Sequence, residues 1–352
     1  MLSSKILVLK NYDDTLLQAV VDPAGSSLQR HHSPSTTPEK KAGHDAWSDT
    51  PSEHDTARTL RVVLFSKFGT MYDAASSKEL ATWLVHAHIC WLNYLLKGFL
   101  HRDISISNVL VLKSRSEVFQ VPEGTGRSPI IWRNDLSEEA QTWHKKVTHI
   151  LAELPITETT SPLAFVTDGD MSANLCKYLA DATERGERSG IPEFMSDKLR
   201  RAFEMNTHHL HNPIEDLSSL FFVGVWAILF NCRNQPRRTA EEYQWREDLG
   251  TGDRTQRCKV IGEIFMCSAE GEYIGSPIVS QWLSTLEKWK RALDELNGLW
   301  AREVLRVKPG GQSDTDYFPL RFYEFGLRGL SVVLVPLAEL LRQLEKDGGP
   351  DF

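Results

Sequence analysis

The sequence is poor in cysteine, and its few cysteines have no spacing that would stabilise a small domain or bind zinc. Five occur among 352 residues, and no two of them have the C-x-x-C spacing. An odd number without such a pair indicates neither a disulfide framework nor a zinc ribbon. We therefore expect a chain that folds without disulfides in a reducing compartment inside the cell, the cytoplasm or the nucleus.

Long hydrophobic runs are missing as well. The longest apolar stretches are 80–100, which two histidines interrupt, and 217–230, which is too short to cross a bilayer. Near the N-terminus, the apolar run 6–9 is too short for the hydrophobic region of a signal peptide. These absences predict a soluble protein with no membrane association.

An excess of positive charge is absent too. Lys and Arg number 40 against 47 Asp and Glu, so the formal net charge is -7. A general binder of nucleic-acid phosphates would be basic or carry a basic patch, so we expect no nucleic-acid partner. Hydrophobic residues make up 41% of the chain, which is enough for a full core and predicts a folded protein.

The first 59 residues lack a glycine-rich phosphate-binding loop. No G-x-G-x-x-G occurs there, and only Lys10 directly follows a strand-like apolar run. One strand is predicted at 6–9. The Ser, Thr, Pro and His residues that follow predict a loop or disordered linker up to residue 59. Lys10 is therefore only a weak candidate for a residue that contacts nucleotide phosphates.

From residue 60 onward the pattern is that of a folded domain. β-Branched and apolar residues predict a strand over 60–66, and apolar residues three or four apart predict a long amphipathic helix over 78–98. Two more short strands are predicted at 108–112 and 163–167. The polar stretch between these strands is predicted to be an insertion with its own helix at 136–154.

Helices dominate the predicted structure downstream. Asn212, followed by proline, predicts the start of a helix that is apolar nearly all round over 217–230 and belongs at the centre of a globule. The polar residues 232–260 predict a surface loop with a short helix. An aromatic stripe over 282–300 favours core packing over a partner-binding face. Pro336 is predicted to begin the final helix.

The strongest functional signal lies between the long helix and the strand at 108–112. His101, Arg102, Asp103 and Asn108 fit H-R-D-x-x-x-x-N, the pattern of the protein-kinase catalytic loop. Phosphoryl transfer needs a carboxylate that accepts the proton of the attacking hydroxyl, and Asp103 is the candidate base. It also needs hard oxygen ligands for Mg²⁺. Asn108 and Asp168, which follows the next predicted strand, are the candidates.

With three further segments, this loop resembles the fungal-type protein kinase family of the eukaryotic protein-kinase superfamily. The motifs occur in the family's order and cover the chain from about 60 to about 230. The resemblance implies ATP- and Mg²⁺-dependent transfer of phosphate to Ser or Thr hydroxyls of a protein substrate. It rests on His-Arg-Asp-Ile-Ser at 101–105, Thr-Asp-Gly-Asp-Met-Ser at 167–172, Arg-Ser-Gly-Ile-Pro-Glu-Phe-Met-Ser at 188–196 and Glu-Asp-Leu-Ser-Ser-Leu-Phe-Phe at 215–222.

The resemblance also implies an α+β, protein-kinase-like fold with a reduced or degenerate N-lobe and a mainly helical C-lobe. Segment 64–69 would be the hinge under the adenine. The expected regions are a degenerate N-lobe remnant and disordered linker at 1–59, a kinase-like domain at 60–346 and a tail at 347–352. Within the kinase-like domain, the expected parts are a hinge strand and hinge at 60–76, a C-lobe at 77–346 and an insertion at 114–160.

The same resemblance assigns roles to residues around the loop. Asp216 would hold the catalytic-loop backbone from the start of the central helix, and His101 would support the loop. The helix dipole also favours an acid at position 216, so a purely local role stays open. Arg102 would pair with a phosphate or acid in the activation segment, where Thr183 and Ser189 are the candidate acceptors.

Departures from the usual kinase pattern keep two alternatives open. Ser105 stands where most Ser/Thr kinases have a lysine, and Gly169 replaces a bulky residue, which we expect to loosen that turn. No Glu lies between Lys10 and Glu39. These losses favour a pseudokinase or scaffold that binds proteins through its C-lobe, whereas the retained base and metal residues oppose it. A small-molecule kinase is the second alternative, against which the peptide-substrate-like segment 188–196 counts.

A histidine cluster is the remaining candidate site. His208, His209 and His211 lie close in sequence, but no acid or thiol has the spacing of a zinc ligand. We therefore expect no zinc site. Neither the substrate nor an oligomeric state follows from the sequence.

Overall fold

The computed structural model is mostly helical with small sheets, which agrees with the predicted α+β class. It divides into two compact units, Ile6–Leu64 and Phe65–Phe352 together with the first five residues. Each unit is described by itself. The structure describes residues 6–8, 62–64, 68–112, 130–131, 133–154, 164–180, 190–207, 209–271, 273–306 and 317–347.

In the smaller unit, the described residues form one antiparallel pair of strands. β1 (Ile6–Val8) pairs with β2 (Val62–Leu64), with Leu7 opposite Val63. All six residues are Ile, Leu or Val, which suit a pleated, paired backbone. The strands predicted at 6–9 and 60–66 are thus confirmed in their central residues. Lys10 lies outside the described residues.

The larger unit contains the small sheets that carry the predicted site. β5 (Val109–Leu112) is the central strand between β3 (Phe68–Thr70) and β6 (Ala164–Val166), and both pairs are antiparallel. A separate pair joins β4 (Phe99–Leu100) to β7 (Ala173–Asn174). Val109 lies opposite Val166, so the start of β5 and the end of β6 meet at one edge. The predicted hinge is partly described: β3 begins at Phe68, and 65–67 lie outside the described residues.

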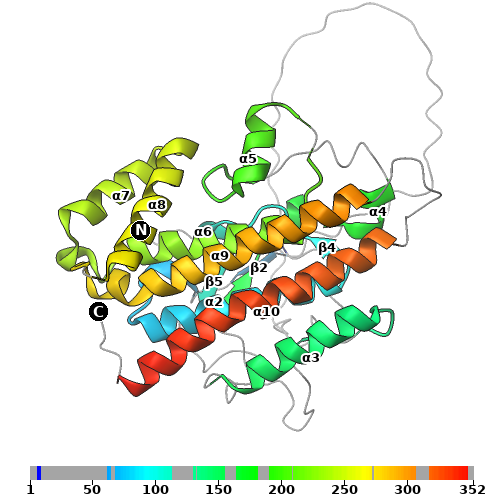
Figure 1. Ribbon diagram of the computed structural model, residues 1–352, viewed down its shortest axis with the longest axis horizontal. Coiled ribbons are helices and arrows are strands. Elements are labelled where there is room, and N and C mark those ends of the chain that lie inside the picture. Colours follow the sequence, from blue (N-terminus) through cyan, green and yellow to red (C-terminus); the bar gives the residue numbers. More distant parts are fainter. Residues whose placement is uncertain are drawn as a thin grey trace, which may run out of the picture. The chain divides into compact units, whose positions relative to one another are not determined.

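Helices make up most of the larger unit. α9 and α10 run side by side, and α3 lies along α10 (Figure 1). The described helices are α2 (Ser77–Leu96), α3 (Glu138–Ala152), α4 (Leu175–Ala180), α5 (Asp197–Glu204), α6 (Pro213–Leu229), α7 (Ala240–Gly250), α8 (Arg254–Glu270), α9 (Pro277–Arg306) and α10 (Tyr317–Lys346).

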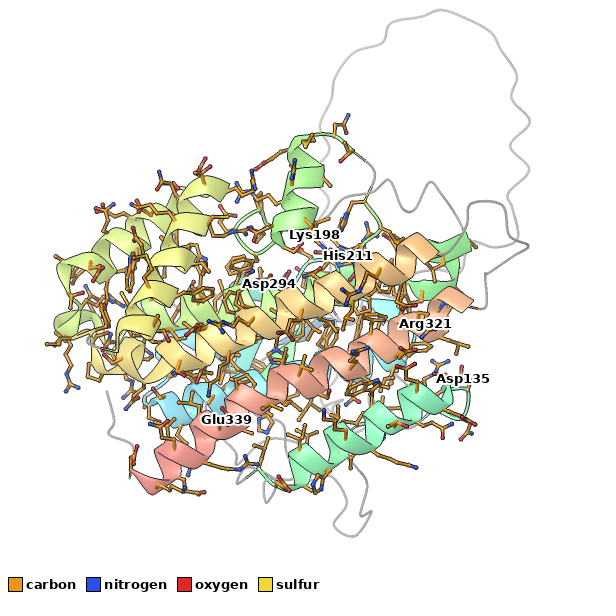
Figure 2. The ribbon with its side chains drawn as sticks, viewed as in Figure 1. Asp135, Lys198, His211, Asp294, Arg321 and Glu339 are labelled. Atoms are coloured by element: carbon orange, nitrogen blue, oxygen red, sulfur yellow. The ribbon has the colours of Figure 1, made fainter. Side chains whose placement is uncertain are left out.

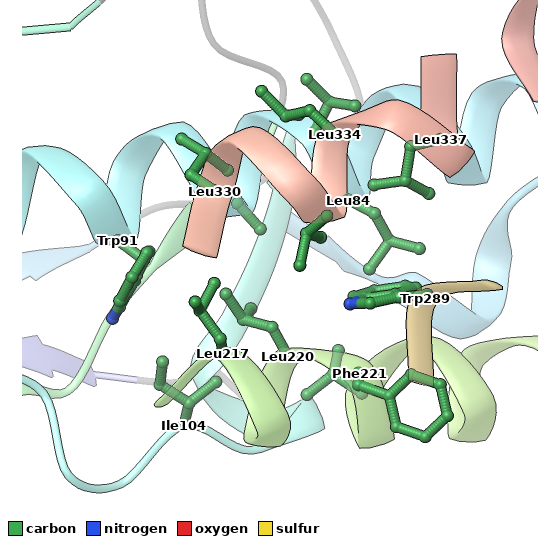
Figure 3. Packing of buried hydrophobic residues seen from close by; sticks show 14 of the residues in the cluster. Leu84, Trp91, Ile104, Leu217, Leu220, Phe221, Trp289, Leu330, Leu334 and Leu337 are labelled. Atoms are coloured by element: carbon green, nitrogen blue, oxygen red, sulfur yellow. The ribbon is translucent and has the colours of Figure 1, made fainter. Parts of the chain in front are cut away.

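Helix α6 lies in the middle of the hydrophobic core, as predicted for its all-round apolar sequence. Asn212 caps it by accepting from the backbone N–H of Ile214 at 2.9 Å. α2, α9 and α10 all pack on it. The ring of Phe221 meets Trp289 of α9 edge to face, with centroids 5.4 Å apart (Figure 3). Trp226 is the one residue of α6 that is not buried.

The aromatic stripe of α9 belongs to this core, as predicted. Trp282 and Trp289 are fully buried, and Trp300 is buried against aromatic residues of α10. Burying large aromatic side chains is among the strongest contributions to a core. The stripe therefore stabilises the fold and leaves no aromatic face along α9 for a partner.

Two predictions about helix boundaries were wrong. Pro336 lies inside α10 and does not begin it. Proline removes one backbone donor and normally interrupts a helix, but the leucines on both sides of it are buried. Residues 232–260, predicted to be a surface loop with one short helix, contain the whole of α7 and the start of α8. Their polar surface hides the inward-facing Trp245 and Leu249, which are buried.

The predicted insertion helix α3 is integrated into the core. No other pair of described elements packs as extensively as α3 and α10 do. Ion pairs join the two helices near both ends, Arg321 to Glu139 at 3.6 Å and Arg342 to Glu153 at 3.0 Å (Figure 2 labels Arg321). Exposed ion pairs contribute little free energy, so the buried apolar face of α3 holds it in place. Among the described helices, none is both long and apolar enough to serve as a membrane span.

A buried histidine in α2 makes stability depend on pH. His88 is fully buried, its Nδ1–H donates to the carbonyl of Leu84 at 2.6 Å, and its ring lies 5.2 Å from that of Trp289. Burial lowers the pKa of His88 from 6.5 to about 4. The unfolded chain therefore binds more protons between these two values, and stability falls as pH decreases through that window.

We expect acidification from pH 7 to pH 4 to remove about 3 kcal/mol of unfolding free energy through His88. His88→Leu has a similar volume and no titratable nitrogen, so this part of the pH dependence should disappear. Urea denaturation of both proteins at pH 7 and pH 5 measures the difference, expected to be about 2 kcal/mol. Equal pH slopes in the two proteins would contradict the assignment.

Candidate active site

The loop with the kinase-like pattern connects α2 to β5. Gly98 follows α2 with φ 91°, a left-handed conformation that glycine adopts without strain, and turns the chain into β4. Residues 101–105 then run without regular structure, and one turn of 3₁₀ helix, Ile106–Asn108, leads into β5. The helix, loop and strand occur in the order that the sequence predicted.

Asp216 binds the backbone of this loop from the first turn of α6. Its Oδ2 accepts from the backbone N–H of His101 at 3.1 Å, and its Oδ1 accepts from that of Arg102 at 3.0 Å. Trp91 Nε1 and His211 Nε2 donate to the same carboxylate at 3.1 Å and 2.9 Å. Asp216 is 1% exposed, so this carboxylate satisfies four buried donors. Two of these donors belong to the backbone of the loop, so Asp216 contacts the loop directly.

The charge of Asp216 is maintained despite its burial. Burial alone would raise the pKa of Asp216, but His211, together with His101 and the indole of Trp91, outweighs that effect and leaves the pKa below its ordinary value. The adjacent Glu215 is fully buried and accepts from His209 Nε2 at 2.8 Å. These histidines therefore bind carboxylates. Among the described residues, no group of three His, Cys, Asp or Glu side chains could hold a metal ion.

Asp103 lies half-buried at the middle of the loop. The backbone N–H of Ile191 donates to its carboxylate, while its Oδ1 atom is buried without a partner. Burial raises the pKa of Asp103, and the negative charge of Asp168 raises it further. A carboxylate with a raised pKa and an unused oxygen is suited to accept a proton from a substrate that enters the site.

Asn108 and Asp168 are brought together by the β5–β6 pair. The backbone N–H of Thr167 donates to the carbonyl of Asn108 at 2.7 Å, and His101 Nε2 donates to the carbonyl of Thr167 at 3.0 Å. Asn108 Nδ2 donates to the backbone carbonyl of Asp103 at 2.9 Å, which leaves its amide oxygen available for a ligand. Asp168 is exposed, and its backbone adopts the left-handed conformation, with φ 63°.

Gly169 lies in a tightly packed turn, contrary to the expectation of a loosened one. A Cβ atom at this position would lie 2.7 Å from the hydroxyl oxygen of Tyr94, closer than van der Waals contact allows. The ring of Tyr94 also packs against that of His101, with centroids 5.7 Å apart. The side chain of Tyr94 therefore fills the space beside the turn.

Arg102 and Ser105 both lie in the loop, but their side chains make different contacts. Arg102 has a positive φ of 68°, and its guanidinium lies 5.4 Å from the ring centre of Tyr178. The candidate phosphate acceptors Thr183 and Ser189 lie outside the described residues. Ser105 is fully buried and bonds the hydroxyl of Ser107 at 2.8 Å, so it is part of the loop's internal packing.

Arg257 of α8 is a residue of this site that the sequence did not reveal. Its Nη1 donates to the carbonyls of Pro192, Glu193 and Met195, and its Nη2 binds Asp197 at 2.6 Å. These contacts hold the segment that follows Ile191, whose N–H binds Asp103. The region around Arg257 was predicted to be a surface loop with a short helix, and only the tertiary contacts show its role.

The order and geometry of these residues agree with a comparison to protein families. The family model of the fungal protein kinases matches residues 5–228, more than half of the chain. The chain belongs to the fungal protein kinase family. No curated protein and no solved structure matches it. The match includes the smaller unit's strands as well as the loop, the β5–β6 pair and most of α6. The suggested resemblance is therefore confirmed, and the family's name suggests a protein kinase activity.

Proposed function

We propose that this protein transfers the γ-phosphoryl group of ATP, with Mg²⁺, to Ser or Thr hydroxyls of an intracellular protein substrate, within the kinase-like fold that the family implies. One observation carries the proposal. Asp103, Asn108 and Asp168 are held in one place, the loop by Asp216 and the two metal-ligand candidates by the β5–β6 pair. Membership of the fungal protein kinase family supports it.

Asp103 would act as the base. Its raised pKa brings it closer to neutral pH, where a general base is most effective, and its unpartnered Oδ1 can accept the hydroxyl proton. The N–H of Ile191 fixes the orientation of the carboxylate. In phosphoryl transfer the protein chiefly positions groups and stabilises charge, so this orientation is a substantial part of the catalysis.

The residues present fit a magnesium ion shared with a nucleotide. Asn108 offers an amide oxygen and Asp168 an exposed carboxylate, both hard ligands of the kind that Mg²⁺ prefers. Burial and the negative charge of Asp168 both raise the pKa of Asp103. A cation bound between the two carboxylates would offset their negative charge. When bound, the metal supplies charge neutralisation on the phosphates. Two protein ligands suffice because phosphates and water complete the coordination.

The scaffold alternative rests on what is missing around the phosphates. No G-x-G-x-x-G occurs in residues 1–59, and the lysine common two residues after the base is Ser105. Phosphate charge would therefore be less compensated than in an ordinary kinase, and slow transfer is expected. Neither a membrane nor a nucleic acid is proposed as a partner. A protein that binds no nucleotide would favour the scaffold.

ATP with Mg²⁺ should raise the melting temperature of the wild-type protein, because ligand that binds only the folded state stabilises it. Asp168→Ala should abolish the Mg²⁺-dependent part of this shift without lowering the melting temperature of the free protein, since Asp168 is exposed. Asp294→Ala, which removes an exposed acid of α9, is the matched control and should keep the full shift. Equal shifts in Asp168→Ala and wild type would contradict the metal assignment.

A further inference from the structure

A partly exposed group of aromatic and arginine side chains lies where the end of α6 meets α7. The rings of Trp226 and Phe230 stack with centroids 4.4 Å apart and planes 9° from parallel. The guanidinium carbon of Arg246 lies 4.6 Å from the ring centre of Phe230 and 5.8 Å from that of Tyr243, which is 42% exposed. With Arg238, these residues form the aromatic–arginine patch.

Three donors of the patch lack an acceptor. The atoms Trp226 Nε1, Arg238 Nε and Arg246 Nε are buried, and none has a hydrogen-bond partner. Folded proteins satisfy nearly all of their buried donors, so three unsatisfied ones in one place need a physical reason. Trp226, Arg238 and Arg246 are each only partly buried as whole residues, so their exposed parts can contact a ligand, and a small rotation of the side chains would turn these donors toward its acceptors.

Among the residues that the structure describes, the positive charge of the patch is only partly offset. Arg238 donates to the carbonyl of Asn231, and neither Arg238 nor Arg246 forms an ion pair with a carboxylate of the described residues. Glu242, one turn before Arg246, uses its Oε1 for the hydroxyl of Tyr273 and the N–H of Ser276, while its Oε2 is buried without a hydrogen-bond partner. Burial and the charge of Arg246 lower the pKa of Arg238, whereas Tyr243 and Glu242 oppose part of this effect, so the two cations influence each other next to one acid.

The patch is connected to the active-site loop by direct contacts. Trp226 packs against Phe194, with ring centroids 5.5 Å apart. The backbone N–H of Phe194 donates to the carbonyl of Ile191 at 2.9 Å, and the N–H of Ile191 holds Asp103. The patch and the segment next to Asp103 therefore belong to one packed region of the larger unit, and an extended peptide bound at Asp103 would advance about 3.3 Å per residue across it.

We propose that the aromatic–arginine patch binds an acidic side chain of the protein substrate, a carboxylate or a phosphate, a few residues from the phosphorylated hydroxyl. Guanidinium groups bind such oxygens with several planar donors, and the rings offer a surface for the neighbouring residues of the peptide. The protein's net charge is -7, so general attraction of anions does not provide this preference. The inference rests on the proposed phosphoryl transfer and names its substrate class.

A positional peptide scan tests the inference. Each peptide carries one acceptor Ser in a neutral background, with one Glu, phosphoserine or Gln at every position within five residues on either side. At one or two neighbouring positions, Glu or phosphoserine should raise kcat/KM about tenfold over Gln, chiefly through KM, as one charge-assisted hydrogen bond would. The two acids distinguish a carboxylate-bearing from a previously phosphorylated substrate.

Substitutions identify the residues responsible. Arg246→Gln and Arg238→Gln should each lower the ratio of kcat/KM for the acidic peptide to kcat/KM for the neutral peptide toward one. Arg246→Glu should instead favour a peptide with Lys at that position. Arg246→Lys keeps the charge but loses the planar donors, so it should retain part of the preference. Arg291→Gln, an exposed arginine of α9 paired with Glu287, is the matched control and should keep the full ratio. Melting curves check that each variant is folded.

The outcomes separate this inference from the proposed function. Wild-type protein that phosphorylates acidic and neutral peptides equally well, or variants that keep the preference, would overturn the inference and leave phosphoryl transfer standing. If no peptide is phosphorylated, the proposed function fails, and fluorescence anisotropy without ATP decides the binding question. Binding that requires the acid and both arginines supports the patch, whereas equal binding of acidic and neutral peptides overturns it.

Discussion

Replacing Asp103 by Asn is expected to lower the rate of phosphate transfer to a Ser/Thr peptide by about 10² to 10⁴, the usual loss when general-base assistance is removed. The amide has nearly the same shape but cannot accept the proton. Stability should be unchanged or slightly higher, because burial and Asp168 both disfavour the charged carboxylate in the folded protein. Initial rates with radiolabelled ATP, Mg²⁺ and peptide measure the effect.

Asp294→Asn is the matched control for this experiment. It removes a carboxylate of α9 that pairs with the neighbouring Lys290 and should leave the rate unchanged. Asp103→Asn with wild-type activity would show that the loop does not supply the base. Transfer undetectable even in the wild type, together with no binding of ATP, would favour the scaffold function.

Asp216→Ala is expected to lower the unfolding free energy by about 4 to 8 kcal/mol and to abolish transfer. The substitution leaves four donors without their acceptor: the N–H groups of His101 and Arg102, Trp91 Nε1 and His211 Nε2. Each unsatisfied buried donor costs about 1 to 3 kcal/mol, and relaxation or entering water recovers part of this. If the variant folds, urea denaturation measures the loss of unfolding free energy. If it does not fold, a low yield of soluble protein reports the destabilisation.

Asp216→Asn separates the two contributions of this side chain. The amide keeps the shape and one acceptor oxygen but places an NH₂ group against the remaining donors, so an intermediate loss of stability is expected. Activity should fall further than stability does, because the loop that carries Asp103 loses one of its two backbone anchors. If Asp216→Ala melted like the wild type, the anchoring of the loop by α6 would be wrong.

Elements whose signal is local were predictable from the sequence. The periodic leucines and tryptophans of α2 and α9, the N-cap Asn212 and the short apolar strands all appear where they were predicted. The catalytic-loop pattern was visible for the same reason, since its residues lie within one continuous segment. Their roles in catalysis, and the expected domain boundaries, stay predictions that the proposed experiments address.

Features that depend on packing were missed. The polar faces of α7 and α8 hid buried residues such as Trp245, and the leucines around Pro336 carry α10 through a residue that normally ends a helix. Ser105 stands where most Ser/Thr kinases have a lysine. It is fully buried, so Ser105→Lys would force a charge into the loop's interior.

The sequence by itself determined the family, the position of the H-R-D-x-x-x-x-N pattern and the mainly helical character of the larger unit, because motif order and hydrophobic periodicity are properties of neighbouring residues. Only the tertiary structure decided what surrounds the site. Arg257 reaches the segment after Ile191 from α8, Tyr94 fills the space beside Gly169, and Arg246 stacks on Phe230 from a different helix. Contacts between residues distant in the chain arise from how helix faces pack, and no local pattern encodes them.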